Sequence, residues 1–138
     1  MSTRILIADN NRTHLMVMKE FFEAQGFEID TASSSIDVWR LLDRQPAVMI
    51  LDTPLDNHND EQDTSGLLVA KTISILIPII IFTSYTSVEA VREAFGANCY
   101  GLPAVVDFIS KSEEGLEVLL EVVQTVVSCK GADLGLPV

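Results

Sequence analysis

The sequence predicts an α/β domain in which helices cover both faces of a doubly wound parallel sheet. Residues 47–51 and 79–82 are continuously apolar, and residues 4–8 are apolar after the first position. Continuous apolar strands are buried on both faces, as they are in a parallel sheet. Segments with the apolar spacing of helices alternate with these strands, which is typical of strand–helix–strand units.

Each remaining element has its own local pattern. The helix expected over 13–25 carries Leu15, Met18 and Phe22 at core spacing and stops at Gly26. Residues 27–31 alternate apolar and polar, which predicts a half-exposed strand at or near a sheet edge. A fifth strand is expected over 105–109. Further helices are expected at 35–44 after a cap at Ser35, at 66–74, from Ser87 onward, and at 114–128.

The burial pattern also orders the strands. The strands 4–8, 47–51 and 79–82 are apolar and therefore central, whereas 27–31 and 105–109 contain acids and therefore flank them. With right-handed crossovers this division predicts the strand order 2-1-3-4-5, a flavodoxin-like (βα)5 fold in a single domain. We expect the domain to span 1–128 and residues 129–138 to form a C-terminal tail or the start of a linker.

Composition narrows the function classes. The chain has 138 residues and a net charge of −11, which disfavours direct nucleic-acid binding and attachment to anionic membranes. Cys99 and Cys129 form no paired motif, which is typical of a reducing compartment. The N-terminus has no signal-peptide h-region. The apolar run 75–82 is too short to span a bilayer. These features favour a cytoplasmic protein.

Polar side chains follow four of the predicted strands. Asp9 and Asn10 follow the first, Asp52 the third, Thr83 and Ser84 the fourth, and Lys111 lies just beyond the fifth. Because chemistry in an open parallel sheet gathers at the carboxyl ends of the strands, we expect these groups to converge. Two acids, hydroxyls and an ammonium predict a site for a divalent cation and a phosphoryl group.

Over residues 4–128 the chain resembles a response-regulator receiver domain of two-component signalling. The matching residues are Asp9, Asn10, Asp52, Thr83, Ser84, Phe108 and Lys111. The resemblance implies that Asp52 accepts a phosphoryl group from a histidine kinase or phosphotransfer protein. It also implies a Mg²⁺ (or Mn²⁺) ion held by Asp9, Asn10, Asp52 and the backbone carbonyl of Pro54.

The resemblance further implies a switch. Lys111, Thr83 and Ser84 would contact the phosphoryl group, and Phe108 would rotate into the space that Thr83 leaves. Tyr85 would shield the phosphoaspartate from water. The domain would phosphorylate itself rather than turn over a substrate, so it would not be a conventional enzyme. The surface changed by the switch would bind a downstream protein target. Separately, the last helix has apolar residues on more than one side, which suggests a partner surface or a homodimer.

The sequence departs from the family pattern, which keeps an alternative open. Asn10 replaces an acid and should weaken Mg²⁺ binding, Ser112 stands where the family usually has proline, and the acidic loop 53–65 is long. Asn10 and Ser112 favour a degenerate receiver that binds proteins without phosphorylation, whereas the retained Asp52, Thr83 and Lys111 count against it. A flavin-binding relative is disfavoured because the turn 9–12 contains no glycine. His14 and His58 are interpreted as surface polar residues.

Overall fold

Parallel strands form the centre of the molecule, as the sequence predicts. The computed structural model describes residues 3–55, 65–74, 76–84, 86–96, 105–112 and 114–135. Within them a single five-stranded parallel sheet has the order β2-β1-β3-β4-β5. The strands are β1 (Arg4–Ala8), β2 (Glu28–Ala32), β3 (Val48–Leu51), β4 (Ile79–Thr83) and β5 (Asp107–Ser110). This confirms the predicted fold class and strand order.

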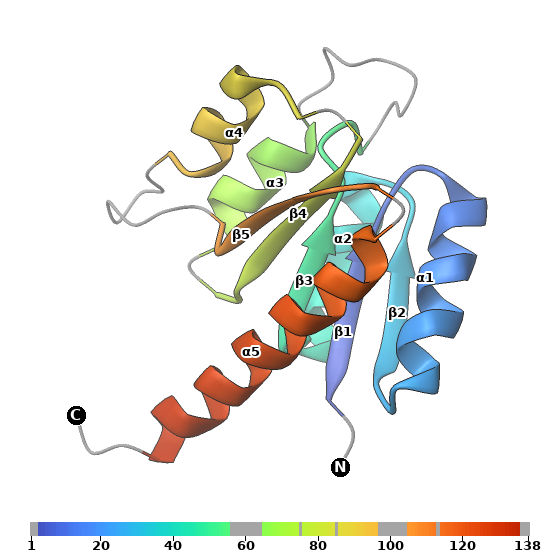
Figure 1. Ribbon diagram of the computed structural model, residues 1–138, viewed down its shortest axis with the longest axis vertical. Coiled ribbons are helices and arrows are strands. Elements are labelled where there is room, and N and C mark those ends of the chain that lie inside the picture. Colours follow the sequence, from blue (N-terminus) through green and yellow to red (C-terminus); the bar gives the residue numbers. More distant parts are fainter. Residues whose placement is uncertain are drawn as a thin grey trace.

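Helices cover both faces of the sheet (Figure 1). They are α1 (Arg12–Ala24), α2 (Ser35–Leu41) with a 3₁₀ turn η1 (Leu42–Arg44), α3 (Ser65–Ile73), α4 (Val88–Ala94) and α5 (Gly115–Gly135). α1 and α5 lie on one face, and α2, α3 and α4 lie on the other. Among the described residues, none of the helices has the length and hydropathy that a membrane span requires.

The sheet separates two hydrophobic clusters, because successive strand side chains point to opposite faces. Ile5 and Ile7 of β1 face α1 and α5, where Phe22 is fully buried. Leu6 and Ala8 face the other way and pack in the cluster that contains α2 and α3. Burying both faces of the central strands holds the carboxyl ends of β1, β3 and β4 in fixed positions.

Helix ends show where local chemistry sets the boundaries. The Asn11 side chain caps α1 by accepting a hydrogen bond from the His14 backbone N–H at 3.1 Å. Gly26 follows α1 with φ 96°, a left-handed conformation that suits glycine. Ser34, and not Ser35 as predicted, caps α2 by accepting from the Asp37 N–H at 3.3 Å.

The last helix is longer than expected, since α5 continues to Gly135 instead of stopping near residue 128. Residues 131–135, expected as part of a tail or linker start, are therefore helical. Figure 1 shows that the C-terminal part of α5 extends past the sheet. The division of the chain at residue 128 stays a prediction.

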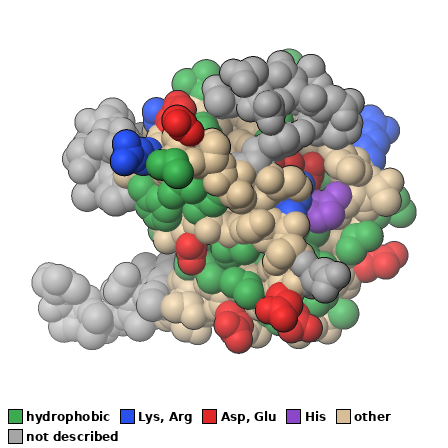
Figure 2. Space-filling model, turned by 45° about the horizontal axis from the view of Figure 1, so that its top comes forward, with side chains coloured by type: hydrophobic (Ala, Val, Ile, Leu, Met, Phe, Trp, Pro, Cys, Tyr) green, Lys and Arg blue, Asp and Glu red, His purple; other side chains and the backbone are tan. Residues whose placement is uncertain are grey.

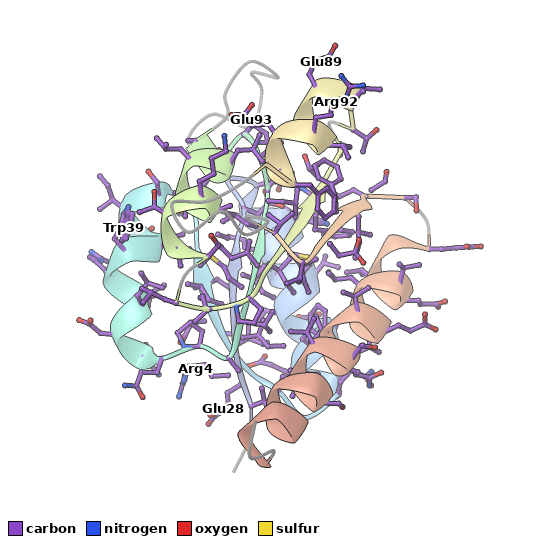
Figure 3. The ribbon with its side chains drawn as sticks, turned by 90° about the vertical axis from the view of Figure 1, so that its left-hand side faces the viewer. Arg4, Glu28, Trp39, Glu89, Arg92 and Glu93 are labelled. Atoms are coloured by element: carbon purple, nitrogen blue, oxygen red, sulfur yellow. The ribbon has the colours of Figure 1, made fainter. Side chains whose placement is uncertain are left out.

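The edge strand β2 is half-exposed, as its alternating pattern predicts. Its outer residues pair with cations at the amino end of the sheet. Arg4 forms ion pairs with Asp30 at 3.1 Å and with Glu28 at 3.4 Å. Figure 3 shows Arg4 and Glu28 next to each other at that end.

Candidate functional site

Backbone hydrogen bonds place the predicted site residues at one edge of the sheet. The Asp9 N–H donates to the Ala32 carbonyl at 3.0 Å, and the Asp52 N–H donates to the Ala8 carbonyl at 3.0 Å. The Lys111 N–H donates to the Thr83 carbonyl at 2.9 Å. These bonds continue the strand ladders by one residue, so the sheet itself positions both acids and the lysine.

Lys111 bridges the two acids. Its ammonium Nζ lies 2.6 Å from Asp9 Oδ2 and 2.8 Å from Asp52 Oδ2. Both acids are buried, at 1% and 4% exposure, and the lysine side chain is 16% exposed. The two carboxylates raise the pKa of Lys111 despite its burial, which would lower it. The ammonium therefore stays charged and neutralises part of the negative charge of the pair.

Asp9 has three hydrogen-bond donors. Burial by itself would raise its pKa, but the His14 hydrogen bond, the charge of Lys111 and the Asn11 N–H together hold the pKa below its usual value. The Asn11 N–H lies 2.9 Å from Oδ1, and His14 Nδ1 lies 2.8 Å from Oδ2. Asp9 is therefore a carboxylate that the protein keeps ionised.

Asp52 lies in a different environment. Burial raises the pKa of Asp52, and the attractions to Lys111 and Thr83 offset only part of that effect, while the charge of Asp9 adds to it. Its Oδ1 atom is buried and has no hydrogen-bond partner among the described residues. A buried carboxylate oxygen without a partner is costly, and such exceptions suggest a site for an ion or a reacting group.

Thr83 is fully buried at the end of β4. Its hydroxyl lies 3.1 Å from the hydroxyl of Thr53, the residue that follows Asp52. Thr53 is itself buried and was not among the predicted site residues. The pair places two hydroxyl groups beside the candidate phosphoacceptor.

The oxygen groups of this site fit a hard divalent cation. Asp9 and Asp52 supply carboxylates, Asp52 Oδ1 accepts no hydrogen bond from any described residue, and Pro54 retains its carbonyl. Asn10 is oriented by its amide nitrogen, which donates to the Ser33 carbonyl at 3.2 Å. Within the described parts of the chain, no group of three or more His, Cys, Asp or Glu is arranged to hold a metal ion, so backbone and water ligands would complete the site.

The other predicted switch residues lie nearby or outside the described residues. Ser84 is exposed after β4. Phe108 is half-buried on β5 and packs against the cluster that contains α3. Tyr85, His58 and the loop residues 56–64 lie outside the described residues.

The start of α3 contacts the backbone just after Asp52. The Gly66 N–H donates to the Thr53 carbonyl at 2.8 Å. A side chain at Gly66 would collide with the backbone carbonyl of Asp52, so this close approach requires glycine. The start of α3 is therefore held directly against the backbone of Asp52, which is itself bonded to β1 through the Ala8 carbonyl.

His14 is the main addition to the predicted site: it was interpreted as a surface polar residue, and its partly exposed side chain also contacts a buried acid of the site. Its side chain is 25% exposed, bonds Asp9 and stacks on Phe82 with ring centroids 5.7 Å apart. Figure 2 shows a histidine side chain (purple) at the surface with basic and acidic atoms beside it. The helix geometry was the available signal, because side chains in the first turn of a helix tilt toward its N-terminus, here the site edge.

Comparison with known proteins agrees with this geometry. The family model for the response regulator receiver domain matches residues 5–124. The chain therefore belongs to the response regulator receiver domain family of two-component systems. No curated protein sequence matches the chain significantly.

Solved structures show the same fold. A CheY-like response regulator receiver domain protein from Methanospirillum hungatei JF-1 aligns with a TM-score of 0.76 and 18% identity, over 96% of this chain and 99% of that one. The signal receiver domain of a putative Luxo repressor protein from Vibrio parahaemolyticus aligns with a TM-score of 0.72 and 20% identity, over 97% of each chain. A two-component response regulator from Clostridium difficile aligns with a TM-score of 0.71 and 21% identity, over 92% of this chain and 97% of that one.

Proposed function

We propose that Asp52 accepts a phosphoryl group from a phosphohistidine of a histidine kinase or phosphotransfer protein, with help from Mg²⁺ or Mn²⁺. The observation that carries the proposal is the state of the Asp52 carboxylate. Lys111 holds Oδ2 at 2.8 Å, and Oδ1 is buried with no hydrogen-bond partner in the part of the chain that the structure describes. One oxygen is thus oriented by the protein, and the other is available to form a new bond.

The chemistry follows from these contacts. Asp52 Oδ1 forms the bond to phosphorus while the P–N bond of the donor breaks, and the leaving imidazole takes up a proton from solvent. A bound cation would lower the repulsion between carboxylate and phosphate. Lys111 stays protonated, because both acids raise its pKa, and offers its charge to a phosphoryl oxygen. Asp9 stays ionised and would help to hold the cation.

Signal output would begin at Thr83. Its hydroxyl now faces Thr53 at 3.1 Å, and a phosphoryl group on Asp52 would offer a charged acceptor that binds a hydroxyl more strongly. Movement of Thr83 would open space for the half-buried Phe108 on the neighbouring strand. The surface around β4 and β5 would then bind a downstream protein. We infer a cytoplasmic signalling domain that is not a turnover enzyme.

The test is intact-mass spectrometry after incubation with acetyl phosphate and Mg²⁺. We expect one phosphate adduct on the wild type and none on Asp52→Asn, which keeps the shape of the side chain. An adduct on both proteins would place the acceptor elsewhere. The Asn10→Asp variant restores the missing acid and should form the adduct at a lower Mg²⁺ concentration.

A second candidate is a receiver that binds its target without phosphorylation. Asn10 favours it, because the lost charge lowers cation affinity and its amide nitrogen is held by Ser33 at 3.2 Å. The same experiment separates the two functions. No adduct on the wild type or on Asn10→Asp would favour the phosphorylation-independent binding module.

A further inference from the structure

Building on the proposed function, we propose that His14 is a positioning residue for the cation site, which acts by holding the Asp9 carboxylate in place. The family resemblance assigns no role to this position. His14 Nδ1 lies 2.8 Å from Asp9 Oδ2, and Asp9 is only 1% exposed. The contact is therefore a short hydrogen bond to a buried carboxylate that belongs to the proposed cation site.

The direction of the hydrogen bond follows from its neighbours. Asp9 Oδ2 also accepts from Lys111 Nζ at 2.6 Å, so this oxygen serves as an acceptor in both contacts. The imidazole must then carry its proton on Nδ1. With the Asn11 N–H on Oδ1 at 2.9 Å, donors on both oxygens fix the plane of the carboxylate.

The His14 imidazole also packs against an aromatic side chain, Phe82. Its ring stacks on Phe82 at 5.7 Å between centroids with an interplanar angle of 25°. Phe82 is 2% exposed, and a Cβ at Gly115 would lie 3.0 Å from its ring, so the ring has little room to move. His14 therefore gives Asp9 a rigid donor, unlike a surface side chain that samples many rotamers.

Positioning of this kind matters more here because the site has lost an acid at position 10. Asp9 is then the carboxylate that must hold the cation together with Asp52. Partners that hydrogen-bond a metal-binding carboxylate fix its orientation, and their loss weakens metal binding by about 10–100-fold. We infer that His14 helps Asp9 compensate for the weaker ligand at Asn10.

Two substitutions separate the hydrogen bond from the stacking. His14→Phe keeps an aromatic ring over Phe82 and removes the donor. His14→Asn keeps a nitrogen donor at the same number of bonds from the backbone as Nδ1 and removes the ring. Met16→Ala, on the same helix at 65% exposure, controls for general effects of changing α1.

The experiment measures the affinity of each protein for MnCl₂ from the electron paramagnetic resonance signal of free Mn²⁺, without any phosphoryl donor. Circular dichroism verifies that each variant is folded. We expect binding to be about tenfold weaker or more in His14→Phe, and near wild type in His14→Asn and Met16→Ala. Equal affinity of His14→Phe and wild type, or selective weakening of His14→Asn, would overturn the inference and leave the proposed function intact.

A spectroscopic measurement adds a readout that packing alone would not change. In ¹⁵N-labelled protein the His14 ring, assigned by its absence from the His14→Asn spectrum, should carry its proton on Nδ1 with and without Mg²⁺. Loss of that proton signal when Mg²⁺ binds would contradict a positioning role, because the cation would then displace the imidazole. Failure of the wild type to bind Mn²⁺ would reject the cation site and this inference together.

Discussion

Asp52→Asn should stabilise the protein in the absence of divalent cations. The substitution keeps the shape of the side chain and removes a buried charge whose Oδ1 has no hydrogen-bond partner within residues 3–55, 65–74, 76–84, 86–96, 105–112 and 114–135. An unsatisfied buried polar atom costs about 1–3 kcal/mol. For 138 residues, 1 kcal/mol corresponds to a change of about 3–4 °C in Tm, so we expect Tm to rise by about 3–12 °C.

The stability that Asp52→Asn gains should increase as the pH rises. The pKa of Asp52 is raised by burial, so the folded protein binds this proton more tightly than the unfolded chain does. Stability contributed by the protonated carboxyl is then lost as the pH rises from the ordinary carboxyl pKa of about 4 through the folded value. The advantage of Asp52→Asn should therefore grow as the pH rises toward 7 and should shrink toward zero near pH 4.

Thermal and urea unfolding in chelator at pH 7, 6, 5 and 4 test this. Asp30→Asn is the matched control, because Asp30 Oδ2 accepts from Arg4 at 3.1 Å and from Arg44 at 2.9 Å. That variant should lose up to about 1 kcal/mol instead of gaining stability. A Tm of Asp52→Asn at or below the wild-type value at pH 7 would refute the reasoning, as would an advantage that persists at pH 4.

Four further substitutions test other parts of the structure. Lys111→Met leaves the buried carboxylates of Asp9 and Asp52 without the ammonium group that pairs with both. The free energy of unfolding, measured by urea titration at pH 7, should fall by about 3–5 kcal/mol. Adding Mg²⁺ to the titration should restore part of this loss. Gly66→Ala places a Cβ against the Asp52 carbonyl and should cost about 3 kcal/mol or more, and a wild-type Tm would contradict the close approach. In Gly26→Ala the added Cβ meets no described atom within 4 Å, so the cost comes from the backbone φ of 96° alone. The free energy of unfolding in urea should fall by about 1 kcal/mol. Gly26→Asn should lose less stability, because asparagine tolerates this conformation better.

The sequence was sufficient for the fold and for the convergence of Asp9, Asp52 and Lys111. Continuous apolar strands can only be buried centrally, and the alternating strand can only be an edge, so the order of the sheet followed. Once the order is known, residues at the carboxyl ends of β1 and β3 must be neighbours. The side-chain roles of these residues stay predictions that the phosphorylation experiment tests.

What the sequence did not reveal depends on side-chain direction across elements. His14 lies in the first turn of α1, and periodicity alone cannot distinguish a solvent-facing position from one that tilts back over the strand ends. Thr53 is similar, because its contact with Thr83 joins two strands that are distant in sequence. The cap at Ser34 was missed by one residue because three consecutive serines offer equivalent hydroxyl groups.

The net charge of the site determines how Asn10 affects cation binding. Asp9 and Asp52 contribute two negative charges and Lys111 one positive charge, so the three side chains carry a net charge of −1. An acid at position 10 would make this −2 and would leave the cation-free pocket under stronger repulsion. Asn10 therefore relieves the cation-free state but weakens the attraction for Mg²⁺. Since the donors on Asp9 oppose its protonation, the carboxylate stays available when the cation arrives, and phosphorylation should need a higher cation concentration than it would with an acid at position 10.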